Sequence, residues 1–139
     1  MSSRSNARKR ALNLLYEADI KGLSVLDIWE ERKQEDDLPP NEYSYQLIAG
    51  IAENQVDIDK AISDVSADWR LDRMSAVDRA ILRIGAYEIL YVQSVDTPVA
   101  ISESLLLAQE LSGEESPTFI NGVLGGLASR PNPATNSPI

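Results

Sequence analysis

Hydrophobic side chains in the stretch from Ser75 to Val92 point in nearly every direction when the residues are placed on a helix at about 100° per residue. The apolar positions of this stretch are Val77, Ile81, Ile84, Ile89, Leu90 and Tyr91. A helix that is apolar around most of its circumference has to be surrounded, either by other helices or by lipid. Four charged residues interrupt the stretch, whereas a membrane span needs about 18 or more consecutive apolar residues. We therefore expect a central helix with other helices packed around it.

One-sided apolar stripes at helical spacing predict further helices on both sides of this stretch. Thr97-Pro98 and Ser116-Pro117 each place a capping residue before a proline, which is typical of a helix start. The expected helices cover about residues 5–21, 24–34, 41–52, 56–65, 97–111 and 116–127, and no stretch shows useful β-type alternation. Gly50 permits close approach of a neighbour to its helix. Gly122, Gly125 and Gly126 cost helix propensity and predict closely packed backbones around the last helix.

Two connecting segments, an acidic one ending in Pro39-Pro40 and a turn near Trp69, separate the expected helices into two groups. The predicted fold is all-α, a bundle of about seven helices in two three- to four-helix halves, about residues 5–66 and 67–130. Both halves belong to a single domain over residues 1–130. Residues 131–139 are rich in proline and asparagine, and we expect a disordered tail there.

Composition favours a binding protein over an enzyme. The 139 residues include no Cys and no His, which excludes Cys–His and Ser–His–Asp machinery and the usual nitrogen or sulfur zinc site. No motif gathers carboxylates in an enzyme-like arrangement, so we expect no catalytic residue, no metal and no cofactor. The absence of Cys also favours a cytoplasmic protein without disulfides.

Charge is unevenly spread along the chain. Four of the 13 basic residues lie in the first ten positions with no acid among them, which leaves nine basic against 22 acidic residues, a net charge of −13, for the rest. An acidic body repels nucleic acid over most of its surface, so phosphate contacts are expected only at a small basic patch. The alternative is that the basic start is a solvated segment without a binding role.

The first expected helix carries a basic and aromatic row on the side opposite its apolar stripe. Lys9, Asn13 and Tyr16 lie almost in line, and Arg8 and Arg10 flank the row. A cation, an amide and an aromatic ring on one exposed face suit single-stranded RNA, whose bases stack on aromatic rings and whose phosphates need neutralising. The competing interpretation is that Tyr16 packs against a neighbouring helix and the cations are solvated.

Three blocks of sequence match a known family when they are taken together. They are residues 7–18 (ARKRALNLLYEA), residues 69–88 (beginning WRLDRMSAVDRAILR) and residues 97–124 (containing TPVAISE and FINGVL). In this order, over nearly the whole chain, they resemble the NusB family of bacterial transcription antitermination factors. The resemblance implies a two-part helical fold that binds the boxA element of nascent ribosomal or phage RNA. It also implies a complex with NusE, a small-subunit ribosomal protein, that acts on RNA polymerase to suppress termination, mainly in ribosomal RNA operons, without catalysis.

The resemblance also implies site residues. The RNA-binding candidates are Arg4, Arg8, Lys9, Arg10, Tyr16 and Phe119. The candidates for contact with NusE are Tyr16, Asp72 and Asp78. The sequence leaves open whether Glu114 and Glu115, near the start of the last helix, modulate RNA binding by repulsion.

Two other functions stay open at this point. One is a non-catalytic RNA-binding module related to the domain that precedes the catalytic domain in some ribosomal RNA cytosine methyltransferases. The other is a homodimer that pairs through the first-helix face and so masks the RNA site. Among the charged residues, Arg83 is expected to be a structural cation paired with Glu103 or Glu88 rather than a ligand. Trp69 and Phe119 are expected in the core, although Phe119 can also border the RNA.

Overall fold

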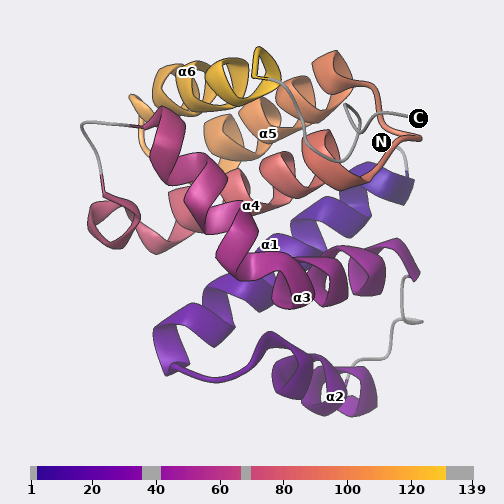
Figure 1. Cartoon of the computed structure of the whole chain (residues 1–139). Coiled ribbons are helices and arrows are strands. Elements are labelled where there is room, and N and C mark those ends of the chain that lie inside the picture. The colour runs from indigo at the N-terminus through magenta and orange to yellow at the C-terminus, as the bar shows by residue number, and fades with distance from the viewer. Residues whose placement is uncertain (1–2, 36–41, 67–69, 131–139) are drawn as a thin grey trace.

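The computed structural model describes residues 3–35, 42–66 and 70–130, and all regular secondary structure in this part of the chain is helical (Figure 1). Its elements are α1 (Ser3–Lys21), α2 (Val25–Glu35), α3 (Glu42–Val65), the short 3₁₀ helix η1 (Leu71–Arg73), α4 (Ala76–Tyr91), α5 (Thr97–Leu111) and α6 (Ser116–Ala128). The all-α prediction is confirmed. The Pro39-Pro40 connector, Trp69 and residues 131–139 lie outside the described residues, and the division into two halves stays a prediction.

Helix α4 is the centre of the bundle. Figure 1 shows it surrounded, and it packs against α1, α3, α5 and α6. Its N-terminus is capped by Ser75, whose side-chain oxygen accepts a hydrogen bond from the backbone N–H of Asp78 at 3.1 Å. Ile81, Leu82 and Ile84 are fully buried although they point to different sides of the helix. The expectation of a central, surrounded helix is therefore confirmed.

The expected helices at residues 41–52 and 56–65 are one helix, α3, so the described residues hold six α-helices rather than about seven. The helix bends at Asn54, whose φ of −111° and ψ of 17° are non-helical. The Asn54 side-chain Nδ2 donates to the Gly50 carbonyl oxygen at 2.8 Å, so that backbone acceptor has a partner next to the kink. The bend lets the apolar stripes of both segments, including Ile51 and Ile58, face the core within one element.

Helix α2 is tied to α1 by a charged cluster. The Glu17 carboxylate of α1 accepts hydrogen bonds from Arg32 of α2 at 2.8 Å and from Lys21 at 2.7 Å. These two cations hold the pKa of Glu17 below its ordinary value, with the Arg32 hydrogen bond as the main cause.

Replacing Glu17 with glutamine is expected to lower the free energy of unfolding by roughly 0.2–1 kcal/mol at neutral pH, the usual range for a partly exposed ion pair. Because the pKa of Glu17 is lower in the folded state, its stabilisation is complete above the unfolded-state pKa and disappears as pH falls through the folded-state pKa. Urea unfolding at a series of pH values should show the wild-type and Glu17→Gln curves converging in acid. Glu31→Gln, an exposed position on α2, is the matched control, and its difference from wild type should not follow this pH dependence.

Candidate nucleic-acid interface

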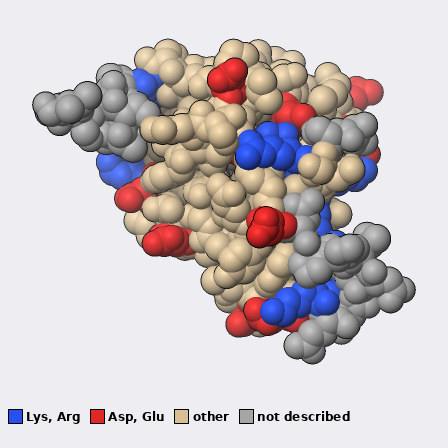
Figure 2. All heavy atoms as spheres, turned by 90° about the vertical axis from the view of Figure 1, so that its right-hand side faces the viewer, with Lys and Arg blue, Asp and Glu red and all other residues tan. Residues whose placement is uncertain are grey.

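The four cations at the start of α1 project to different sides of the helix instead of forming one ledge. Arg8 points into the bundle, Arg4 reaches the connection between α4 and α5, Lys9 meets α5, and Arg10 lies over a ring of α2. Figure 2 faces the end of the bundle where α1 begins, and there Lys and Arg are interspersed with Asp and Glu. The cations of α1 therefore do not form the expected compact basic patch, because they point to different sides of the helix and acidic residues lie between them.

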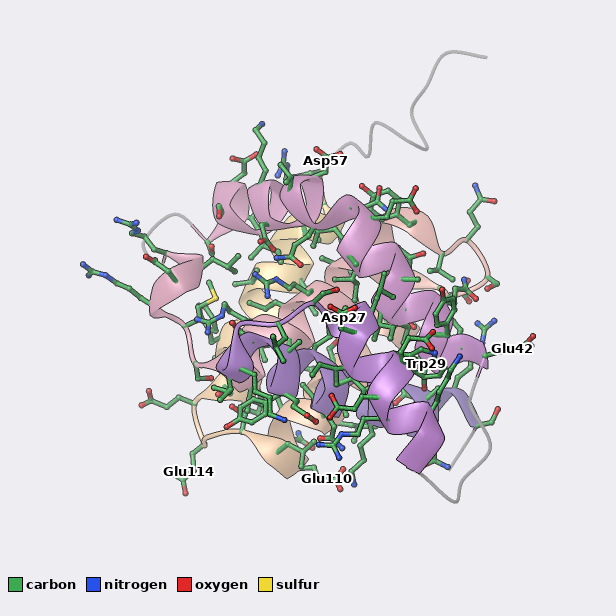
Figure 3. All side chains as sticks on the ribbon, turned by 90° about the horizontal axis from the view of Figure 1, so that it is seen from below. Asp27, Trp29, Glu42, Asp57, Glu110 and Glu114 are labelled. Carbon is green, nitrogen blue, oxygen red and sulfur yellow. The ribbon has the colours of Figure 1, made fainter. Side chains whose placement is uncertain are left out.

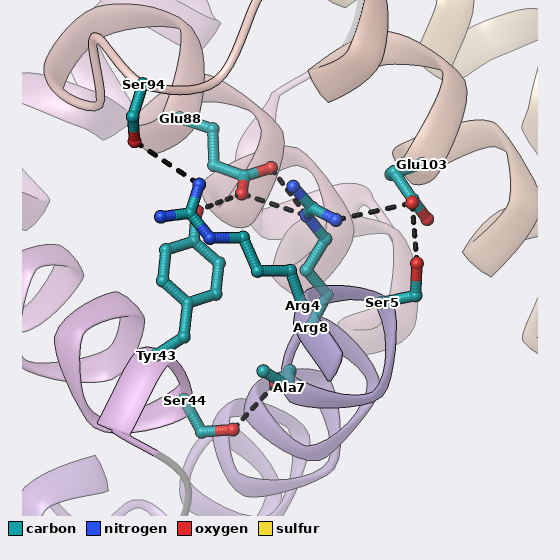
Figure 4. Close-up of polar contacts among 9 residues, drawn as sticks. All are labelled: Arg4, Ser5, Ala7, Arg8, Tyr43, Ser44, Glu88, Ser94 and Glu103. Carbon is teal, nitrogen blue, oxygen red and sulfur yellow. Dashed lines mark hydrogen bonds and ion pairs between the residues drawn. The ribbon is translucent and has the colours of Figure 1, made fainter. Parts of the chain in front are cut away.

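Arg8 is buried, with 3% of its surface exposed. Its Nε donates to the Glu88 carboxylate at 2.9 and 3.0 Å, and its Nη1 lies 3.3 Å from Glu103 Oε1 (Figure 4). The expectation that Arg8 lies on the exposed face is wrong. The reason is its position on the helix, because residues 8, 12 and 15 share one side of α1 and Leu12 and Leu15 are buried there.

Glu88, the partner of Arg8, is a fully buried carboxylate on α4. Burial raises its pKa, and the hydrogen bonds from the Tyr43 hydroxyl and from Arg8 act in the opposite direction. Burial and the Glu88 carboxylate together raise the pKa of Tyr43. The predicted pairing of Arg83 with Glu103 or Glu88 is wrong, since Arg83 instead makes a two-pronged contact with Asp59 of α3 at 2.9 and 3.0 Å.

Arg4 contacts neutral groups rather than the carboxylates that surround Arg8. Its guanidinium carbon lies 4.4 Å from the centre of the Tyr43 ring, within the range of a cation–π contact. Its Nη1 donates to the Ser94 hydroxyl at 3.2 Å (Figure 4). Both contacts are with neutral groups, so the positive charge of Arg4 is held in place without being neutralised.

Lys9 and Arg10 diverge on the next turn. Lys9 is paired with Glu110 of α5, beside a hollow of about 400 Å³ that Leu106 also lines. The Arg10 guanidinium carbon lies 5.9 Å from the centre of the Trp29 ring, and Trp29 in turn contacts Tyr45 of α3 at 5.3 Å between ring centres. No pattern in the sequence marks Trp29, Tyr43 or Glu110 as partners of these cations, because each occupies an ordinary helix position.

Tyr16 is exposed, at 41% of its surface, as the row on α1 predicts. Ile20, one turn further along α1, is 62% exposed. The interpretation in which Tyr16 is packed away inside the monomer is therefore excluded, and an aromatic and apolar surface stays accessible on this side of α1.

A second group of predicted residues lies where α4 and α6 begin. Phe119 and Asp78 line a hollow of about 650 Å³ together with Arg73, Glu114 and Glu115. The Asp78 carboxylate accepts hydrogen bonds from the hydroxyls of Ser112 at 2.7 Å and Ser116 at 3.1 Å. Figure 3 shows Glu114 and the Lys9 partner Glu110 at the same edge of the molecule.

Asp72 lies on η1, is exposed and is paired with Arg70 at 3.2 Å. The structure thus brings Asp78 and Phe119 to one hollow, and Asp72 precedes the hollow-lining residue Arg73 on η1. Sequence reasoning missed Arg73, because it reads as one residue of a short turn.

None of the helices in the described residues is both long enough and apolar enough to cross a bilayer. Within the same residues, no cluster of acidic side chains is placed to hold a metal ion.

Comparison with known proteins agrees with this geometry. Residues 5–129 match the sequence model of the NusB family. The chain is 48% identical over 128 residues to the transcription antitermination protein NusB of Kineococcus radiotolerans, covering 92% of this chain and 94% of that protein. It is 44% identical over 127 residues to the protein of the same name from a Nocardioides species, covering 91% and 94%.

Solved structures of similar proteins have the same fold. NusB of T. maritima superposes with a TM-score of 0.85 at 29% identity, covering 96% of both chains. A chain from a crystal structure of antitermination factors NusB and NusE in complex with double-stranded RNA superposes with a TM-score of 0.80. That chain is 25% identical, and the match covers 90% of this chain and 95% of that one.

Proposed function

Because the chain belongs to the NusB family, we propose that it is a transcription antitermination factor that binds boxA RNA together with NusE. The observation that carries the proposal is the family match over residues 5–129, joined to a similar fold seen with NusE and RNA. In this role the protein binds and does not catalyse. It works in the cytoplasm as part of the antitermination complex on RNA polymerase, mainly in ribosomal RNA operons.

We assign the RNA contacts to the cations of α1 that keep access to solvent, which are Arg4, Lys9 and Arg10. Arg8 supports them from inside the bundle, since its charge is matched by Glu88 and Glu103. Tyr16 contributes an exposed aromatic ring. Phe119 contributes a partly buried ring at the border of the hollow where α4 and α6 begin. NusE contacts are assigned to Tyr16, Asp78 and Asp72, since carboxylates suit the basic surface of a ribosomal protein.

The test is the salt dependence of RNA binding. With NusE present, the logarithm of the association constant for a boxA oligonucleotide should fall linearly with the logarithm of salt concentration. Each phosphate contact removed should reduce the slope by about 0.7, the value for single-stranded nucleic acid. Replacing Arg4, Lys9 and Arg10 together with glutamine should therefore reduce the slope by about 2.

Lys60→Gln is the control for an unspecific charge effect, because Lys60 lies on α3 with 77% of its side chain exposed. It should leave the slope within error of wild type. Equal slopes for the triple variant and wild type would remove α1 from the RNA site. Absence of RNA binding by the wild-type protein with NusE would contradict the function itself.

A further inference from the structure

We propose that Tyr43 is a positioning residue for RNA binding, which holds the Arg4 guanidinium ready for a phosphate group at the start of α1. The proposal rests on the RNA-binding function proposed above and assigns a role to a residue that does not itself touch RNA. Tyr43 and Arg4 are separated by 39 positions in sequence and meet where the first turns of α1 and α3 come together (Figure 4).

The Tyr43 ring is fixed before any ligand arrives. It is 8% exposed, and its hydroxyl donates to the buried Glu88 carboxylate of α4. Glu88 is itself held by the two hydrogen bonds from Arg8 Nε. One end of the tyrosine is therefore anchored in the bundle, while its ring face is turned toward Arg4 at 4.4 Å.

Arg4 is held but not neutralised. The Tyr43 ring face and the Ser94 hydroxyl, 3.2 Å from Nη1, both contact the guanidinium at the end of this long side chain. A guanidinium has five N–H donors, and the bond to Ser94 uses one of them. Within the described part of the chain Arg4 makes no ion pair. By contrast, Arg8 is paired with Glu88 and Glu103, and Lys9 is paired with Glu110.

Ordering an arginine before binding improves affinity, because the side-chain freedom that a flexible arginine would lose on binding is already lost in the free protein. The same ring offers no charge to compete with a phosphate for the guanidinium. Tyr43 thus connects the buried Arg8–Glu88 pair to Arg4, a cation that is partly accessible to solvent. A purely structural tyrosine would affect stability but would have no reason to affect RNA binding through Arg4.

A double-mutant cycle on the full-length protein tests the proposal, with fluorescein-labelled boxA RNA as the probe and NusE present. Tyr43→Leu removes the ring and should weaken RNA binding about 2- to 5-fold, the range for an exposed cation–π contact. Tyr43→Phe keeps the ring and should bind RNA within about twofold of wild type, although it loses the hydrogen bond to Glu88. Arg4→Gln should also weaken binding, and Tyr43→Leu should then add nothing in the Arg4→Gln background.

Affinity for NusE in the absence of RNA should be the same for all four variants, which separates an RNA effect from loss of folded protein. Equal weakening by Tyr43→Leu with and without Arg4 would overturn the positioning role, as would unchanged RNA affinity in Arg4→Gln. In both cases the wild-type protein still binds RNA and the proposed function stands. Failure of wild-type binding is the distinct result that contradicts the function.

A second series keeps the test decisive if Tyr43→Leu does not fold. Phenylalanine and its mono-, di- and trifluorinated analogues at position 43 have nearly the same shape, and each fluorine weakens the negative face of the ring. RNA affinity should fall stepwise along this series if the ring holds the Arg4 cation. A flat series in folded protein would overturn the proposal.

Discussion

Replacing Arg8 with alanine is expected to lower the free energy of unfolding by about 3–5 kcal/mol, the usual cost of leaving a buried charge without its partner. Glu88 is fully buried, and Arg8 is the cation that offsets the cost of taking its carboxylate out of water. Glu103 also loses a partner, although its side chain keeps 20% exposure and the Ser5 hydroxyl. Chemical unfolding of wild type and variant measures the difference.

The loss of stability in Arg8→Ala should depend on pH. Without Arg8, the pKa of Glu88 rises further above its ordinary value, so the folded variant holds the proton more tightly than the unfolded chain. That contribution is fully present below the unfolded-state pKa and is lost as pH rises through the folded-state pKa. The difference between wild type and Arg8→Ala should therefore be smaller near pH 5 than near pH 8.

Lys9→Ala is the matched control, since it removes the next cation along α1. Lys9 is 37% exposed and pairs with the exposed Glu110, so its loss should cost at most about 1 kcal/mol. A cost for Arg8→Ala as small as that of Lys9→Ala would show that the buried pair is not stabilised as the structure indicates. Weaker RNA binding by Arg8→Ala would then need a direct contact to explain it.

The central helix and the proline-marked starts of α5 and α6 could be predicted because both follow from local physics. A helix that is apolar on all sides has one stable location, and a proline in the first turn of a helix loses no backbone hydrogen bond. The structure confirms these elements at Ala76–Tyr91, Thr97–Leu111 and Ser116–Ala128. The continuity of the two segments that form α3 was harder to predict, since an asparagine that bends a helix has the same sequence signature as one that ends it.

The candidate site was predicted less well, because a charged residue carries no sign of its partner. Arg83 lies among apolar neighbours in the sequence, whereas Arg8 lies among other cations. The burial of Arg8 depends on carboxylates that lie 80 and 95 positions away in the chain. The exposure of Tyr16 was predictable from the helical period alone. The packing of the helices determines which side of α1 faces α4 and α5. That packing therefore decides which of the adjacent cations Arg8 and Lys9 is buried.

Gly50→Ala is the second substitution expected to have a large effect, at about 1–3 kcal/mol of destabilisation from overpacking. A Cβ atom at this position of α3 would lie 2.1 Å from the Tyr87 hydroxyl oxygen and 2.2 Å from its Cζ. The ring cannot move aside freely, because it is stacked on Tyr91 with 5.4 Å between ring centres. The close approach that Gly50 suggests in the sequence is therefore real, and it sets the distance between α3 and α4.

Gly122→Ala on α6 is the matched control, and its expected effect on the free energy of unfolding has the opposite sign. A Cβ atom there meets nothing within 4 Å, so the close packing expected around Gly122 is absent, as it is at Gly125. Alanine at this exposed helical position should stabilise the protein by roughly 0.5–1 kcal/mol, since glycine loses more backbone freedom on folding. In a Tyr87→Leu background the cost of Gly50→Ala should shrink, because the atoms it would meet are gone. Equal costs in both backgrounds would mean that the α3–α4 contact at Gly50 is looser than the structure indicates.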